Sequence, residues 1–355
     1  MLVILLISLL TASIVLADEI QNIYNFQLLN KVIEGNKQLL IDELNIMSKE
    51  SALDDVNDAA TNSKYIAAYT SEDKYDKAIT EEVKPLEAEA AMELAIRTKD
   101  ENLKSLQLTV YKTVMDALLL DQQLEIEKMK LIQLEEKYEL NRVKYKSGTI
   151  DELTLLQFEF DLSNKKNDIQ TIENKLIIVD LELKKILEQP FDGEEIHLQE
   201  ELMLEDESVL SIEQVLINVF NNNRDIYAKN QDLLAKKLTF EIAERYLIAG
   251  DYTYDKALLN YQTALIELED LKKDSEINIR NKSNELLIQR DKVELADISL
   301  QLADKKLKES EFKYKNGGIN KEVFLNEQEK YLNSLYQYYV AIKDYNVKKA
   351  EFENL

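Results

Sequence analysis

Apolar residues recur along the chain with the period of a coiled coil. Alternating steps of three and four residues from Leu103 reach Tyr145, and ten of the thirteen positions visited are apolar. The same steps from Leu155 to Ile186 visit ten positions, of which nine are apolar. A seam sustained over this length predicts long amphipathic helices that pack along one another or along partners.

Glycine and proline are scarce, and their positions divide the predicted helices. Six Gly and two Pro occur in 355 residues, and they leave long segments without any helix breaker. We expect residues 86–147 to pair antiparallel with 149–188, and 252–316 with 319–355, turning near Gly148 and Gly317. The fold class predicted is therefore all-α, made of long antiparallel coiled-coil hairpins with little or no β-structure.

The chain contains an internal repeat. Residues 142–157 match 311–326, so that Gly317 follows Gly148 by 169 residues, whereas residues 33–37 match 220–224 at an offset of 187. The difference, 187 − 169 = 18, places about 18 extra residues in the first copy, most naturally within 54–84. The predicted organisation is a first helical-hairpin repeat at 18–188, an acidic linker at 189–210 and a second repeat at 211–355.

Composition excludes several classes of function. With 44 Lys and Arg against 68 Asp and Glu, the formal charge of −24 opposes nucleic-acid binding, which requires a basic surface. The chain has no Cys and one His, His197, which lies in the acidic linker and is expected to face solvent. No group of residues stands out as a catalytic, cofactor-binding or metal-binding site. We therefore expect a protein that is not an enzyme and uses no cofactor.

The N-terminus has the pattern of a secretory signal. Residues 2–16 form an apolar run without charge, and Val15, Leu16 and Ala17 precede Asp18 in the manner of a cleavage site. We expect residues 1–17 to be a signal peptide, with an uncleaved anchor helix as the alternative. The run is short for a membrane span, which needs about 20 apolar residues. The rest of the chain is then exported to the cell envelope.

The two predicted tips carry a family resemblance. The segments KYKSGTIDELTLLQFEFDL and KYKNGGINKEVFLNEQEKYL, and the Asn-containing VIEGNKQL and VFNNNRDI, resemble outer-membrane efflux (TolC-like) proteins over nearly all of 20–355. The resemblance implies a homotrimer, a twelve-helix tunnel in the periplasm, and tips that dock a periplasmic adaptor linked to an inner-membrane pump. By that resemblance the partner-binding residues are Ser147, Gly148, Thr149, Asn316, Gly317 and Gly318.

The chain departs from that family at the segments where membrane-spanning strands belong. Residues 50–85 and 238–258 show no alternation of apolar and polar residues over a spanning length. We therefore expect an α-barrel protomer that lacks most or all of the membrane strands. The favoured function is an exit duct of an export system in the outer membrane or periplasm. The alternative is a non-conducting, exported coiled-coil scaffold or spacer of the cell envelope.

Overall fold

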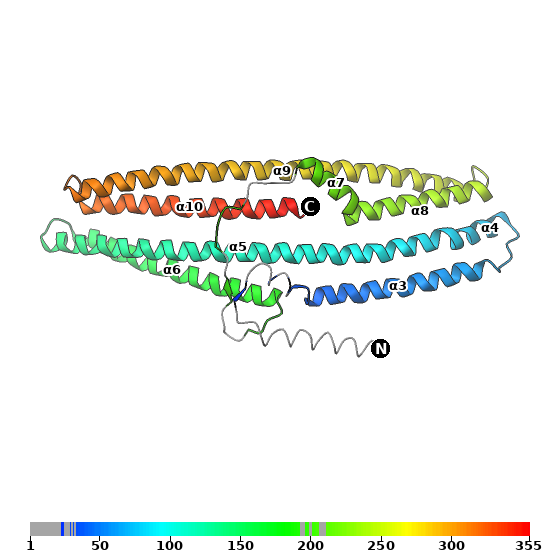
Figure 1. Cartoon of the computed structure of the whole chain (residues 1–355), viewed down its shortest axis with the longest axis horizontal. Coiled ribbons are helices and arrows are strands. Elements are labelled where there is room, and N and C mark those ends of the chain that lie inside the picture. The colour runs from blue at the N-terminus through cyan, green and yellow to red at the C-terminus, as the bar shows by residue number, and fades with distance from the viewer. Residues whose placement is uncertain are drawn as a thin grey trace. The chain divides into compact units, whose positions relative to one another are not determined.

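A computed structural model describes residues 23–24, 29, 31, 33–191, 196–198, 201–205 and 211–355. The predicted signal peptide, residues 1–17, lies outside the described residues. Two-residue strands β1 (Ile23–Tyr24) and β2 (His197–Leu198) pair in parallel. The helical elements are α3 (Lys37–Ser63), α4 (Ser71–Ala78), the π-helix η1 (Ile79–Val83), α5 (Lys84–Lys146), α6 (Glu152–Ile186), α7 (Ile212–Asn222), α8 (Arg224–Tyr246), α9 (Tyr252–Lys315) and α10 (Lys321–Glu353) (Figure 1).

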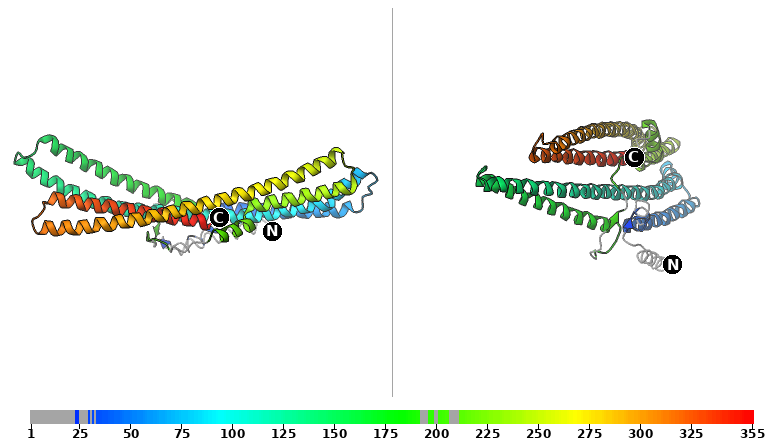
Figure 2. Two further views of the ribbon diagram at one scale, coloured as in Figure 1. Left: turned by 90° about the horizontal axis from the view of Figure 1, so that it is seen from above. Right: turned by 60° about the vertical axis from the view of Figure 1, so that its left-hand side comes forward.

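The two long hairpins form as predicted. Helix α5 has 63 residues and reverses into α6 with 35, and α9 has 64 residues and reverses into α10 with 33. Figure 2 shows each reversal as a tight turn between two long helices. The all-α fold class is therefore confirmed, with β-structure limited, in the described residues, to the single pair of short strands.

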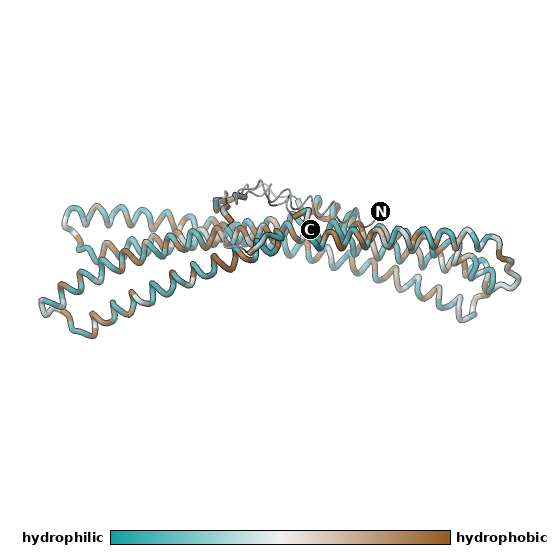
Figure 3. The backbone as a smooth tube through the Cα atoms, turned by 90° about the horizontal axis from the view of Figure 1, so that it is seen from below, coloured by the Kyte–Doolittle hydropathy of each residue, from teal (hydrophilic) through white to brown (hydrophobic). Residues whose placement is uncertain are grey.

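The predicted seams lie on the inward faces of α5 and α6. Every seam position from Leu103 to Asn141 is buried or half-buried, and so is every seam position from Leu155 to Ile186. Among the seam positions of the two helices, only Tyr145, at the very end of α5, is exposed. Apolar and polar positions therefore alternate along each long helix, as the hydropathy colouring shows (Figure 3).

The polar residues within the α5 seam bond either lysine side chains or the helix backbone. Glu127 Oε1 accepts from Lys130 Nζ at 2.7 Å, and its Oε2 accepts from Lys165 Nζ of α6 at 2.6 Å. Asn141 Nδ2 donates to the carbonyl of Lys137 at 2.8 Å. Burial is the largest influence on the pKa of Glu127 and raises it, but the two lysines together outweigh burial and bring the pKa below its ordinary value of 4.5.

The extra residues of the first repeat are spread over several elements. Helix α3 has 27 residues and its counterpart α8 has 23. The remainder lies in the α3–α4 loop and in α4 and η1, which precede α5 without a break. A π-helix is rare and occurs mostly as a single turn inside an α-helical run, which is the position of η1. Residues 50–85 and 238–258 are thus helical apart from the loops at 64–70 and 247–251.

The chain divides into two compact units, each of which contains parts of both repeats. Unit 1 comprises residues 1–32, 108–208 and 284–351, and unit 2 comprises 33–107, 209–283 and 352–355. In unit 1 the described part of the linker packs on helices, because Asn346 of α10 bonds the backbone of both Met203 and Glu205. In unit 2 the core joins both repeats through Ala78, Val83, Ala235 and Ile242.

Among the described residues, no helix has the length and apolar content needed to cross a membrane.

Candidate functional site

The first tip is a tight helix ending built around Gly148. Helix α5 ends at Lys146, and Gly148 adopts a φ of 71°, which an L-residue adopts only with strain. The Gly148 N–H donates to the carbonyl of Tyr145 at 2.9 Å, and the Thr149 N–H donates to that of Lys144 at 2.8 Å. These two bonds define a Schellman motif, which satisfies the last free carbonyls of the helix.

The second tip repeats this geometry. Gly317 has a φ of 72°, and its N–H donates to the carbonyl of Tyr314 at 3.0 Å. The Gly318 N–H donates to the carbonyl of Lys313 at 2.7 Å. The ring of Tyr314 stacks on that of Phe324 across the hairpin, with centroids 5.2 Å apart. In the second tip the motif Tyr-x-x-Gly thus supplies both an aromatic contact and the left-handed residue.

The returning helices begin at capping residues three positions beyond each left-handed glycine. Asp151 Oδ1 accepts from the backbone N–H of Thr154 at 2.9 Å and from its hydroxyl at 2.6 Å. These bonds, led by the hydroxyl, lower the pKa of Asp151. Asn320 Oδ1 accepts from the N–H of Val323 at 2.9 Å in the second tip. Each loop is therefore fixed at both ends by hydrogen bonds.

All six residues predicted from the sequence lie on the surface of these loops. Ser147, Gly148 and Thr149 are exposed in the first tip, and Asn316, Gly317 and Gly318 are exposed in the second. The Ser147 and Thr149 hydroxyls lie 2.9 Å apart, and Asn316 Nδ2 donates to the carbonyl of Phe312 at 2.8 Å. The structure therefore places three of the predicted residues together at each tip, on the exposed surface of the loop.

Ion pairs that the sequence reading missed hold the two hairpins together in unit 1. Three pairs join α5 to α10 below the tips, and each spans less than 3 Å between Nζ and a carboxylate oxygen: Lys144 with Glu322, Lys321 with Glu136, and Lys137 with Glu329. Pairs near the surface each contribute little to stability, and these three show which faces of α5 and α10 meet. The sequence shows the charge of each of these residues, but it does not show that α5 and α10 would meet.

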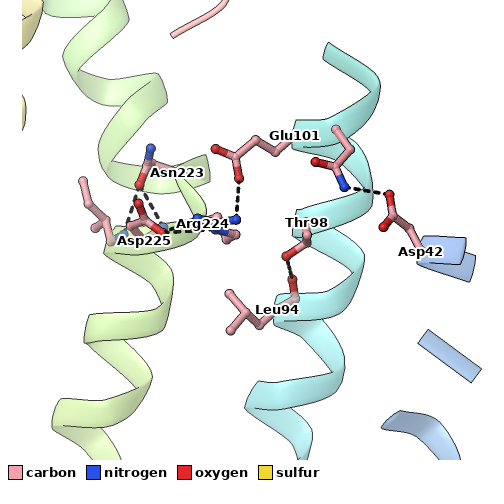
Figure 4. Close-up of polar contacts among 9 residues, drawn as sticks. Asp42, Leu94, Thr98, Glu101, Asn223, Arg224 and Asp225 are labelled. Carbon is pink, nitrogen blue, oxygen red and sulfur yellow. Dashed lines mark hydrogen bonds and ion pairs between the residues drawn. The ribbon is translucent and has the colours of Figure 1, made fainter. Parts of the chain in front are cut away.

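The Asn-containing segments that carried part of the resemblance start helices in unit 2. Asn36 Oδ1 accepts from the Gln38 N–H, and Asn223 Oδ1 accepts from those of Asp225 and Ile226. Beside the second cap, Arg224 lies 3.2 Å from Glu101 of α5 (Figure 4). The arrangement is a helix start braced by an ion pair, and its role is structural.

Among known proteins, this chain is similar to several solved structures, and the similarity lies in the structure and not in the sequence. No family model and no curated protein matches the sequence. The Campylobacter jejuni outer membrane channel CmeC is 12% identical with a TM-score of 0.68 and covers 92% of this chain and 84% of its own. The Vibrio cholerae outer membrane protein VceC is 11% identical, with a TM-score of 0.69 and coverages of 93% and 95%.

A third solved structure agrees with these two. The Neisseria gonorrhoeae outer membrane channel MtrE, in its open state, is 12% identical with a TM-score of 0.68 and covers 93% of this chain and 88% of its own. Agreement over nine-tenths of the chain with several such proteins extends well beyond a shared helical hairpin. The chain therefore has the TolC-like fold of outer membrane efflux channels, as the tip motifs predicted.

Proposed function

We propose that the protein is a duct component of an export system, in which copies assemble side by side into a helical tunnel. The observation that carries this proposal is an asymmetry between the two repeats. Positions that the chain buries in one repeat are exposed at the equivalent places in the other, although both copies carry an apolar side chain there. A second copy of the chain supplies the missing neighbour.

Helices α6 and α10 show this asymmetry directly. Leu325 of α10, which lies in the hairpin that packs on α5 in unit 1, is 2% exposed. Leu156 stands 169 residues earlier, at the equivalent place on α6, and is 51% exposed. By the logic of the repeat, the helix that covers Leu156 is the equivalent of α5, which is α9. The pairing of α5 with α10 inside one chain is thus expected to recur as α9 with α6 between copies.

One of the three ion pairs between α5 and α10 has a complementary counterpart at this proposed seam. Within the chain, Lys321 of α10 pairs with Glu136 of α5 at 2.9 Å. The equivalent residues are Glu152 of α6 and Lys305 of α9, so the signs are exchanged but the pair remains one acid and one base. Both side chains are exposed. A seam between copies would therefore restore an ion pair as well as bury leucines.

The six tip residues supply the docking end. Three copies, the number that the family resemblance implies, would present six tips of similar backbone geometry, and a ring of weak contacts gains affinity through multivalency. A helical hairpin of a periplasmic adaptor is the partner that the resemblance suggests. The proposed mechanism is passive conduction, with no chemistry on the cargo. If the excess of acidic residues faces the lumen, it would favour cationic cargo over polyanions.

The mass of the assembly, combined with its end-on image, tests this function. Native mass spectrometry is expected to give three copies, and electron micrographs are expected to show a central opening in end-on particles. The alternative is a non-conducting scaffold of the envelope. An exposed coiled-coil surface, taken by itself, would also suit such a scaffold. Monomers, or bundles without an opening, would favour that scaffold over the duct.

A further inference from the structure

The ion pair between Lys137 and Glu329 has no counterpart at the proposed seam between copies. Lys137 of α5 lies 2.8 Å from Glu329 of α10, and the residue 169 positions after Lys137, on α9, is again a lysine, Lys306. The residue of α6 equivalent to Glu329 is Phe160, which carries no charge. The cation is therefore present in both repeats, whereas the acid that neutralises it is present in one.

The acids nearest to Lys306 along α9 are bonded to other lysines. Asp304 lies 2.6 Å from Lys308, and Glu309 lies 2.6 Å from Lys313. Lys306 itself is exposed and takes part in no ion pair with any residue that the structure describes. Its own helix therefore leaves this cation without a neutralising acid.

The acids of α6 beside Phe160 are engaged as well. Glu159 accepts from the hydroxyl of Tyr138 at 2.9 Å, which holds its carboxylate across its own hairpin. Asp161 accepts from a side-chain amide one turn earlier on α6, at 2.8 Å. At the proposed seam, Lys306 would thus meet an aromatic ring where its equivalent in the first repeat meets a carboxylate. A ring attracts an ammonium group but does not cancel its charge.

The side of α9 that carries Lys306 lies between the two seams of that helix. Lys306 follows Ala303 by three residues and Leu302 by four, and residues at these spacings are neighbours on a helix surface. Ala303 is half-buried and equivalent to Leu134, which belongs to the seam within the hairpin. Leu302 stands seven residues after Leu295, on the face proposed to meet the next copy. In a closed ring, the side within the smaller angle between two such contacts faces the axis, so Lys306 is expected to face the lumen.

We propose that Lys306 gives the duct wall near the tips a ring of positive charge that selects anionic cargo. This inference rests on the proposed duct, in which each copy supplies one such lysine. Helix α9 ends at Lys315, so Lys306 lies about 13 Å from its end. Rings of basic side chains favour anions in pores. The net charge of −24 does not set the sign here, because the acids around Lys306 already have partners.

A single thiol beside Lys306 measures the sign of this local charge. The chain has no Cys, and Phe160→Cys places one thiol where the proposed seam brings Lys306 of a neighbouring copy close. The probes are two methanethiosulfonate reagents, one with a sulfonate group and one with a trimethylammonium group, applied to the full chain at low ionic strength. The ratio of their reaction rates reports the local potential. Comparing variants that carry the same thiol cancels the intrinsic difference between the reagents.

We expect Lys306→Gln to lower the preference of the thiol for the sulfonate reagent several-fold. Salt at about 1 M should abolish the preference, because the Debye length is then about 3 Å. Lys308→Gln is the matched control: it removes the same charge two residues away, on the opposite side of α9, and should leave the ratio unchanged. Leu156→Glu, which is expected to separate the copies, should remove the effect of Lys306→Gln.

Light scattering on the Phe160→Cys protein separates the two ways in which this inference can fail. Assembled chains whose ratio does not change with Lys306→Gln would overturn the lysine ring and leave the duct standing. An equal response to Lys308→Gln would overturn it too, because the charge would then not be confined to the enclosed side. Chains that stay monomeric would remove the duct and this inference with it.

Discussion

Leu295 on α9 and Ile126 on α5 occupy equivalent positions of the two repeats, yet Leu295 is 67% exposed and Ile126 is 2% exposed. The sequences of the repeats have kept both positions apolar, and the chain itself covers only one of them. A face with this property is typical of a homo-oligomer, in which a neighbour completes what the single chain leaves open.

The first prediction tests this face. Leu156→Glu and Leu295→Glu are each expected to reduce assembly to the single chain, because a charge at a buried seam is costly. Ile298→Glu is the control, since Ile298 and its equivalent, Met129, are both exposed. Size-exclusion chromatography with light scattering gives the mass, and circular dichroism checks that the helices remain. Full assembly of both leucine variants would exclude the seam.

The second prediction concerns the tips. Nothing lies within 4 Å of a Cβ built on Gly148 or Gly317, so only their positive φ requires glycine. Valine at either position should cost on the order of 1–2 kcal/mol locally and misplace the loop. The double variant Gly148→Val with Gly317→Val is expected to fold but to lose adaptor capture in a pull-down and export in cells.

Gly318→Thr provides the matched control for the tips. Gly318 lacks a positive φ, and the first tip already carries Thr149 at the equivalent place. A Cβ there would lie 3.3 Å from the Lys313 carbonyl, which requires only a small adjustment. This variant should retain adaptor capture. If the double valine variant captures the adaptor as well as the parent chain does, the tips are not the docking site.

The third prediction concerns acid stability. Because the folded-state pKa of Glu127 is below 4.5, its ionised form stabilises the native chain above that pH, and the contribution is lost as pH falls through the lowered value. Glu127→Gln should cost about 1.5–3 kcal/mol near neutral pH. The difference in unfolding free energy between the two proteins should shrink below pH 4.5. A difference that is constant with pH would mean that the pair with Lys165 does not form.

The fourth prediction concerns the helix start in unit 2. Asn223 caps α8 by accepting two backbone N–H groups, so Asn223→Ala should lower the stability of the chain by about 1 kcal/mol. Asn223→Asp keeps the acceptor and should be nearly neutral. Chemical denaturation of the three proteins measures both changes. Equal losses in the two variants would assign the effect to something other than the cap.

The helix seams and the tips could be predicted from the sequence, because they depend on local patterns of residues. Periodicity located the seam from Leu103 to Asn141, because burial of a helix face follows its own spacing. Glycine located both tips, because Gly148 and Gly317 mark φ values that other residues avoid. The contrast between Leu156 and Leu325 could not be predicted in this way, since both are leucines in matching segments and differ only in their neighbours.

The features that the sequence did not predict depend on packing between residues far apart in the chain. The ion pair of Lys144 with Glu322 joins residues 178 positions apart, and nothing in their local sequence selects one partner among so many charges. The docking of Met203 and Glu205 against Asn346 likewise arises from tertiary fit.

The central claim, that α9 of one copy packs on α6 of the next, is tested most directly by cross-linking. The chain has no Cys, so Glu152→Cys with Lys305→Cys places two unique thiols for a short bis-maleimide. The control is Glu136→Cys with Lys321→Cys, the equivalent pair that meets within one chain at 2.9 Å in the parent protein. We expect the first protein to give covalent species of two and three chains, with none larger, and the control to link within the monomer. Monomers alone from Glu152→Cys with Lys305→Cys, while the control links fully, would contradict the account.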